Sequence, residues 1–196
     1  MGTGKYYSFT IKIITSIVLL FYLSSCFEKK SYSKTIKIND LFFQGEVKVE
    51  KIEKLNKYKV TIINSTTGLS DRIYTPYEIF QMEIGDVNHD GKTDICIGII
   101  KPTPFDPVFK KRLFIFQIDR DYIRPLWLGS RLVNPLEEFR VCKNNNKITI
   151  KTIERQINNI YCVNEYRWES FGMSFIKKHN NSLSYSNALL ILNNSK

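Results

Sequence analysis

A short acidic loop lies between two segments that have the composition of β-strands. Residues 77–84 and 95–100 are rich in aliphatic and aromatic side chains, and the segment between them reads GDVNHDGKTD. Side-chain oxygens recur along this loop at Asp86, Asn88, Asp90 and Asp94. The loop therefore constrains the chain to a fold in which two strand-like segments flank a tight polar connection.

The spacing of these oxygens is typical of a site for a hard cation such as Ca²⁺. Side chains at the first, third and fifth positions converge on one ion when the backbone coils tightly, and Gly91 permits that turn. The main-chain carbonyl of Lys92 would supply the seventh position and Asp94 the ninth. An EF-hand is excluded, because its twelfth position needs a bidentate glutamate and is Ile97 here. The alternative is a polar turn without metal, and His89 stands at a position that supplies no ligand.

The segment from Asp86 to Ile95 resembles the calcium loop of the FG-GAP and VCBS repeats, in which an aliphatic residue follows the last aspartate. The resemblance covers 82–98, and the sequence contains no second copy of the loop. It implies Ca²⁺ as a structural cofactor and blade-like sheets of the propeller type. The implied ligands are Asp86, Asn88, Asp90, the carbonyl of Lys92, and Asp94.

Alternating or β-branched segments indicate strands along most of the chain. They are 35–39, 46–50, 58–63, 77–84, 95–100, 112–118, 122–128, 137–142, 147–154 and 160–168. No segment shows an apolar helical stripe over more than two turns, so we expect an all-β fold built as an antiparallel meander. A propeller of four or more blades needs a longer chain, which favours an incomplete propeller-like fold of two or three blade-like sheets.

Three regions leave the meander open to interpretation. The prolines of 101–107 predict an exposed loop beside the metal site, because proline removes donors from a sheet. The apolar segment 188–192 suits either a closing strand or a short docked helix. Cys142 and Cys162 flank a predicted hairpin and are the better candidates for a disulfide, whereas Cys96 is expected to be a buried small hydrophobe.

The N-terminal segment has the features of an export signal. Lys5 and Lys12 lie in or beside a basic start, the apolar core 13–23 follows, and the segment ends Leu-Ser-Ser-Cys at Cys26. This ending resembles the lipobox of bacterial lipoproteins, which implies that Cys26 is lipidated; the alternative is an ordinary signal peptide or anchor. We therefore divide the chain into a signal peptide (1–25), a lipidated tether (26–34) and one β-domain (35–196) with the calcium loop at 86–94.

The chain is basic, with 29 Lys and Arg against 19 Asp and Glu. In an exported protein such a charge suits anionic headgroups or acidic glycans, and a solvated basic surface is the simpler explanation. Nucleic acid is excluded as a partner, because the positive charges form no dense run and the location is wrong. Arg124, Trp127 and Arg131 are the candidate ligand-binding residues, since arginine beside an aromatic ring suits sugars and anionic groups; a core aromatic with extended arginines is the alternative.

These observations predict a lipid-anchored protein of the cell envelope, at the outer membrane or the cell surface. Its calcium-stabilised β-domain would act as a binding module for a glycan or an envelope protein. No nucleophile or general base stands beside the loop, so no catalytic residue is assigned and an enzyme is the less favoured reading. The alternatives are a small envelope enzyme that acts on polysaccharide and a structural accessory subunit of an outer-membrane complex.

Overall fold

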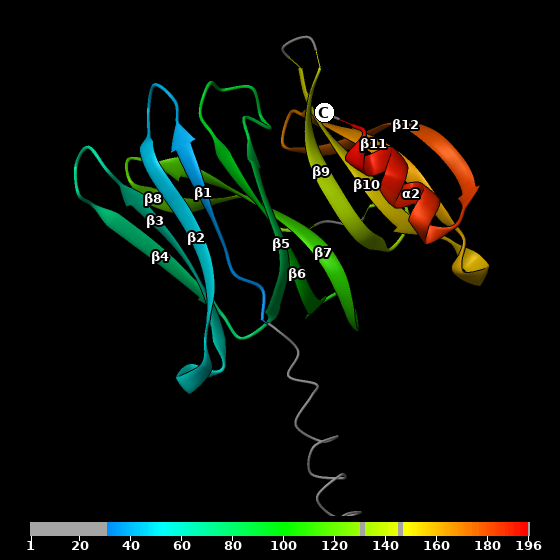
Figure 1. The fold of residues 1–196 in the computed structure, drawn as a ribbon, viewed down its shortest axis with the longest axis horizontal. Helices are drawn as coiled ribbons and strands as arrows, with labels where there is room; N and C mark the ends of the chain where they lie inside the picture. The colour runs from blue at the N-terminus through cyan, green and yellow to red at the C-terminus, as the bar shows by residue number, and fades with distance from the viewer. Residues whose placement is uncertain (1–30, 130–131, 145–146, 196) are drawn as a thin grey trace, which may run out of the picture. The chain divides into compact units, whose positions relative to one another are not determined.

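The structure is a computed structural model that describes residues 31–129, 132–144 and 147–195. The described part is mostly β, in three antiparallel sheets of four strands each and one helix (Figure 1). The expectation of a β-rich antiparallel meander is therefore confirmed. The predicted signal peptide and Cys26 lie outside the described residues.

Each sheet is a meander in which neighbours along the chain are neighbours in the sheet. Sheet 1 contains β1 (Lys34–Asn39), β2 (Gln44–Ile52), β3 (Lys57–Asn64) and β4 (Ser70–Thr75). Sheet 2 contains β5 (Glu78–Gly85), β6 (Asp94–Thr103), β7 (Asp106–Asp119) and β8 (Tyr122–Trp127). Sheet 3 contains β9 (Leu136–Asn144), β10 (Lys147–Arg155), β11 (Tyr161–Glu169) and β12 (Gly172–Leu183). The 3-10 helices η1 (Glu53–Leu55) and η2 (Ile157–Asn159) join strands, and α2 (Tyr185–Asn193) follows β12.

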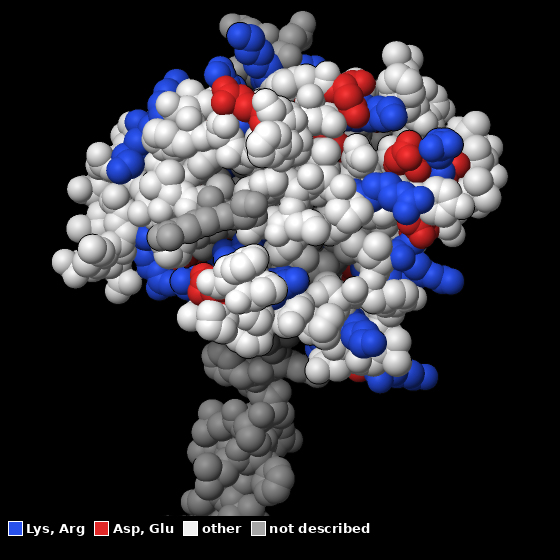
Figure 2. Space-filling view, turned by 180° about the vertical axis from the view of Figure 1, so that it is seen from behind, with Lys and Arg blue, Asp and Glu red and all other residues white. Residues whose placement is uncertain are grey.

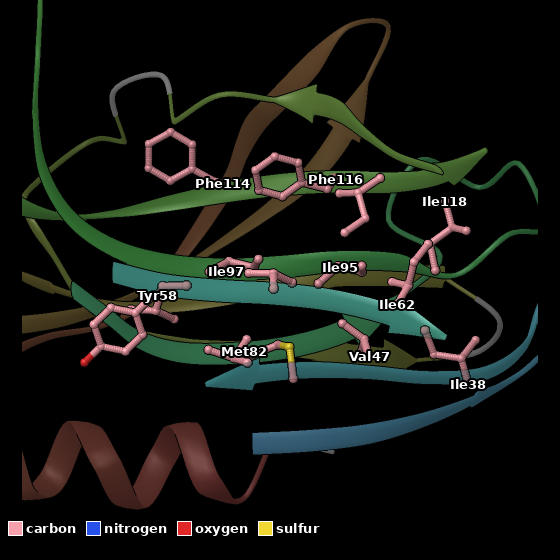
Figure 3. Close-up of a cluster of buried hydrophobic side chains, with 14 of the residues drawn as sticks. Ile38, Val47, Tyr58, Ile62, Met82, Ile95, Ile97, Phe114, Phe116 and Ile118 are labelled. Atoms are coloured by element: carbon pink, nitrogen blue, oxygen red, sulfur yellow. The ribbon is translucent and has the colours of Figure 1, made fainter. Parts of the chain in front are cut away.

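The three sheets stack in chain order through two apolar layers. Between sheets 1 and 2, the alternating side chains Val47 and Ile62 meet Met82, Ile95 and Ile97, all fully buried (Figure 3). The opposite face of sheet 2 packs on sheet 3 through a second cluster, which includes Cys96, Leu113, Ile115, Trp127, Phe139 and Ile150. Sheet 2 is thus buried on both faces, which explains the continuous apolar sequence of β6.

The first strands of the three sheets run in the same direction. Lys34 of β1 donates to the carbonyl of Met82 in β5 (2.8 Å). Gln81 of β5 bonds both the amide and the carbonyl of Phe139 in β9. Because the sheets are meanders, the β1–β2, β5–β6 and β9–β10 connections share one end of the stack, here called the loop end (Figure 1). The β2–β3, β6–β7 and β10–β11 connections share the opposite end, where the chain enters β1; it is called the entry end.

The two outermost faces of the stack are covered differently. The outer face of sheet 1 carries Lys48, Glu50 and Lys59, with the Glu50 carboxylate 2.5 Å from Lys48 and 2.6 Å from Lys59. The outer face of sheet 3 carries an apolar patch, Ile153 and Val163, on which Ala188 and Leu192 of α2 pack. Ser184 caps α2 by accepting a bond from the amide of Asn187. Of the two alternatives for 188–192, the docked helix is therefore the one observed.

The proline-containing segment 101–107 is a hairpin, and the predicted loop beside the metal site is wrong. Strand β6 continues to Thr103 and β7 begins at Asp106, with Thr103 paired to Asp106. Pro102 is tolerated because the register shifts between Lys101 and Thr103. The hairpin turns at the entry end, whereas the acidic loop lies at the loop end. Strand β6 has ten residues, so its two ends are about 30 Å apart.

The proposed disulfide is absent, because Cys96, Cys142 and Cys162 are free and buried. Cys142 lies on the face of sheet 3 that α2 covers, with its sulfur 3.6 Å from the carbonyl of Ser195. Cys162 is paired across strands with Glu154 and faces the sheet 2 side, 3.8 Å from the Asn134 amide. Side chains on opposite faces of one sheet cannot form a disulfide.

Candidate functional site

The acidic loop connects β5 to β6, and its ends are held by the sheet. Gly85, the last residue of β5, pairs with Asp94, the first residue of β6. Two residues of the loop have a left-handed backbone, His89 (φ 61°) and Gly91 (φ 85°). Glycine reaches this region without strain, which is the role expected for Gly91. His89 is exposed.

Three predicted ligands turn their oxygens toward amides of the same loop. The Asp86 carboxylate accepts from the amides of Asp90 and Gly91, at 3.0 Å each. The Asn88 side-chain oxygen also accepts from the Asp90 amide at 3.2 Å. The Asp90 carboxylate accepts from the Lys92 amide at 2.9 Å. These bonds coil the backbone tightly and bring the three side chains to the same side of one short turn.

Asp94 is the buried member of the set. Its side chain is fully inaccessible, and one carboxylate oxygen accepts from the amides of Val87 (2.9 Å) and Asn88 (3.4 Å). The other oxygen has no hydrogen-bond partner. Burial raises the pKa of Asp94 to about 7, and the carboxylates of Asp90 and Asp86 add to the rise while the two amides oppose it. An unpartnered buried oxygen is costly, and a cation would relieve both that cost and the repulsion between carboxylates.

The donor set fits a hard cation by its chemistry. Every side chain in it presents oxygen, and carboxylate, amide and carbonyl oxygens are the ligands that Ca²⁺ takes. Within the described residues, however, no three His, Cys, Asp or Glu side chains converge closely enough to hold a metal ion. The loop therefore has the ligand types that Ca²⁺ takes, but their oxygens accept hydrogen bonds from amides of the loop itself.

An additional carboxylate, which the sequence patterns did not single out, holds the end of this loop. Asp40, in the β1–β2 turn, accepts from the amides of Phe42 (2.8 Å) and Phe43 (2.7 Å). Its second oxygen accepts from the amide of Thr93 at 2.9 Å. Although partial burial opposes the shift, these bonds lower the pKa of Asp40. The Lys92 amine also lies 5.6 Å from the centre of the Phe42 ring. Sheet 1 thus contacts the loop that sheet 2 carries.

The candidate ligand-binding residues do not form one surface. Arg124 is exposed and lies 5.1 Å from the Tyr122 ring centre. Trp127 is 7% exposed and belongs to the second apolar cluster, so its ring packs in the core. Arg131 lies outside the described residues.

A cleft of about 950 Å³ opens at the entry end, between the β6–β7 hairpin and the segment 132–136. Apolar side chains line it together with four cations, Lys101, Lys110, Lys111 and Arg112. Asp106 pairs with Arg112 (2.9 Å) and Lys110 (3.1 Å), and Glu137 pairs with Lys111 (3.0 Å). The Lys101 amine lies over the rings of Tyr77 and Phe114. The lining is therefore amphipathic, with cations in excess.

One wall of this cleft is fixed by a buried carboxylate. Glu154 is fully buried and accepts from the amide of Asn134 (2.7 Å), from Asn164 (2.8 Å) and from the Tyr166 hydroxyl (2.6 Å). The Tyr166 oxygen in turn accepts from the amide of Val133 at 3.1 Å. These bonds attach 133–134 to sheet 3, so the cleft is preformed. The sequence signal was weak, because Glu154 resembles any other polar residue at a strand end.

A second polar group lies on the face of sheet 3 that α2 covers in part. The Glu165 carboxylate accepts from the Thr149 hydroxyl (2.8 Å) and lies 2.5 Å from the His179 ring nitrogen. In a hydrolase triad the histidine lies next to the nucleophile, whereas here the carboxylate separates the two. This group therefore lacks the order that a triad requires.

Comparison with protein-family models, with curated protein sequences and with solved structures finds no match for this chain. Within the part of the chain that the structure describes, no helix is long and apolar enough to cross a membrane.

Proposed function

We propose that this chain is a lipid-anchored protein of the cell envelope whose β-domain is stabilised by Ca²⁺ and acts as a binding module. The observation that carries the calcium part is the loop 86–94, with oxygen side chains at alternate positions and an unpartnered buried oxygen on Asp94. The anchor rests on the lipobox-like sequence that ends at Cys26.

The calcium ion would be held by the side chains of Asp86, Asn88, Asp90 and Asp94 and by the carbonyl of Lys92. When bound, it supplies positive charge to a loop that carries three carboxylates. The expected role is structural, because the site lies on a hairpin connection that contacts sheet 1 through Asp40. No catalytic step is assigned to it.

The arrangement supports a propeller-like reading of the fold. Four-stranded meanders that stack face to face in chain order are the repeating unit of β-propellers. The polar outer face of sheet 1 and the α2-covered face of sheet 3 would end the series without a fourth blade. We therefore propose an open, incomplete propeller-like domain of three blade-like sheets.

Calcium titration of the segment 32–196 tests the metal site. This segment is one compact unit and contains all three apolar clusters, so it carries its own core. Ligand that binds only the folded state stabilises it by about 2.7 kcal/mol at a hundredfold excess over Kd. We expect Ca²⁺ to raise the melting temperature and Asp90→Ala to abolish that rise.

The matched control is Asp119→Ala, which removes a carboxylate from the last residue of β7, at the same end of the stack. Its calcium response should equal that of the unaltered segment. A melting temperature that Ca²⁺ leaves unchanged, with calorimetry showing no calcium binding, would refute the calcium assignment.

A further inference from the structure

The β6–β7 hairpin projects an apolar tip from the entry end. Phe105 is 98% exposed, Phe109 65% and Val108 53%, and Pro104 and Pro107 beside them are also exposed. Such a cluster of large apolar side chains on one hairpin marks an interaction site rather than ordinary surface. Leu55 in η1 and Ile157 in η2 are exposed at the same end, so all three entry-end connections carry an apolar tip.

Cations surround these tips. Lys54 in η1 and Lys57, which begins β3, are exposed, and the cations of the cleft lie beside the hairpin. Figure 2 shows Lys and Arg side chains along the lower part of this face of the domain, and others along its upper edge. The loop end also has exposed apolar side chains, among them Leu41 and Phe171. On or beside its connections, however, it carries five carboxylates, Asp40, Asp86, Asp90, Asp119 and Asp121, against the cations Lys92 and Arg120, whereas the entry-end connections carry the carboxylates Glu53 and Asp106.

The place where the connecting chain joins the domain favours one of the two ends. If Cys26 carries the lipid, the segment 27–33 spans at most about 25 Å before β1 begins. Strand β1 starts on the entry side, and its six residues carry the chain about 20 Å toward the loop end. The entry end is thus the end nearer to the point where an anchored segment joins the domain.

We propose that the entry end is a membrane-contact face for anionic phospholipid. Phe105, Phe109 and Ile157 enter the interfacial region, while Lys54, Lys57 and Lys101 face lipid phosphates. Exposed aromatic and aliphatic tips supply hydrophobic affinity, and lysines near an anionic surface add electrostatic attraction. The loop end, with its acidic connections, then faces away from the membrane and presents the calcium loop to a partner. This proposal rests on the proposed lipid anchor for its orientation.

Tryptophan placed at each end gives a site-specific test. Phe105→Trp and Phe171→Trp are made in the segment 32–196, where both side chains are exposed and tolerate a larger ring. Trp127 and Trp168 also emit, so the emission of the unaltered segment is subtracted. With vesicles of phosphatidylcholine and phosphatidylglycerol, we expect the difference emission of Phe105→Trp to shift to shorter wavelength and to be quenched by brominated lipid. The emission of Phe171→Trp should not change. Equal responses at both positions, or none at Phe105→Trp, overturn the proposal.

Vesicle sedimentation measures the contributions of the apolar tips and the charges. Phe105→Ser with Phe109→Ser should weaken binding about tenfold or more, from the lost apolar area. Lys54→Gln with Lys57→Gln should weaken it about fivefold per charge on vesicles with phosphatidylglycerol. Phe171→Ser is the control at the loop end and should bind as the unaltered segment does. Loss of self-association without lipid in the Phe105→Ser variant would show that a second copy covers this face, and would overturn the membrane assignment.

Lipidation is measured separately on the full chain, by incorporation of labelled fatty acid and its loss in Cys26→Ser. Label without vesicle binding by 32–196 leaves the anchor standing and refutes the contact face. Vesicle binding without label refutes the anchor and leaves the contact face standing.

Discussion

At the residue scale, two fully buried carboxylates have opposite environments. Glu154 accepts hydrogen bonds on both oxygens from Thr152, Asn134, Asn164 and Tyr166. Asp94 has an oxygen without a partner. A buried charge is tolerated when donors surround it, so Glu154 is explained as a structural element. The unpartnered buried oxygen of Asp94 would gain a partner if a cation occupied the loop, which supports the loop as the candidate metal site.

The Glu154 network predicts a large loss of stability on truncation. Glu154→Ala removes the acceptor of the buried Asn164 and Tyr166 side chains and of the half-buried Asn134, and should lower the free energy of unfolding by about 3 kcal/mol. Urea denaturation followed by circular dichroism measures the change. Glu169→Ala, at the exposed end of β11 with 44% of its side chain accessible, is the control and should change stability little. A Glu154→Ala protein as stable as that control would contradict the structural role.

At the element scale, the burial of a sheet face determined the secondary structure of 188–192, which the local sequence pattern had left open. The segment 188–192 is too short and too uniformly apolar to distinguish strand from helix by periodicity. It is a helix because Ser184 caps it and because the outer face of sheet 3 offers Ile153 and Val163 as a packing surface. Strands β4 and β12 were not predicted, since both carry many polar side chains and lack a clear apolar alternation. They are strands because each pairs with the neighbouring strand of its sheet.

Helix α2 predicts a contrast between two leucines. Leu192 is fully buried against sheet 3, and Leu190 is 63% exposed. Leu192→Ala should cost about 2–5 kcal/mol, as a large-to-small change in a packed core does, whereas Leu190→Ala should stay within about 0.5 kcal/mol. Thermal melts of the two variants measure the difference. Similar melting temperatures would mean that α2 does not cover sheet 3 in solution.

At the scale of the whole molecule, sheet 2 links the two apolar layers. It packs on sheet 1 with one face and on sheet 3 with the other, so destabilising one layer weakens the support of the other. Asp71 of β4 also accepts from the amide of Ile123 in β8 (2.8 Å), which ties the outer strands of sheets 1 and 2. These contacts favour one cooperative unit over independently folding sheets.

The two tryptophans test this cooperativity. Trp127 and Trp168 both lie in the layer between sheets 2 and 3, so their fluorescence reports on that layer alone. Val60→Ala removes buried volume from the other layer, where Val60 is 1% exposed. In a cooperative unit the tryptophan transition shifts to lower denaturant together with the circular dichroism signal. Ile63→Ala, on the outer face of sheet 1 with 39% exposure, should leave both transitions in place. A tryptophan transition that ignores Val60→Ala would show that sheet 1 unfolds separately.

The sequence by itself determined the elements with strong local signals. Alternating or β-branched apolar residues predicted ten of the strands, because a period of two leaves one face to bury and one to solvate, and a continuous apolar segment such as 95–100 suits a strand buried on both faces. The acidic loop was found from spacing alone, because its possible ligands are close in sequence.

Only the tertiary structure decided which distant residues meet. Asp40 and Thr93 are far apart in sequence, as are Glu154 and Asn134, and no local pattern reports their contacts. The same holds for the entry end, where the prolines of 101–107 form a hairpin tip because β6 and β7 extend past the rest of sheet 2. Local backbone preferences act over a few residues, whereas the stacking of three sheets depends on the burial of faces that the whole chain must assemble.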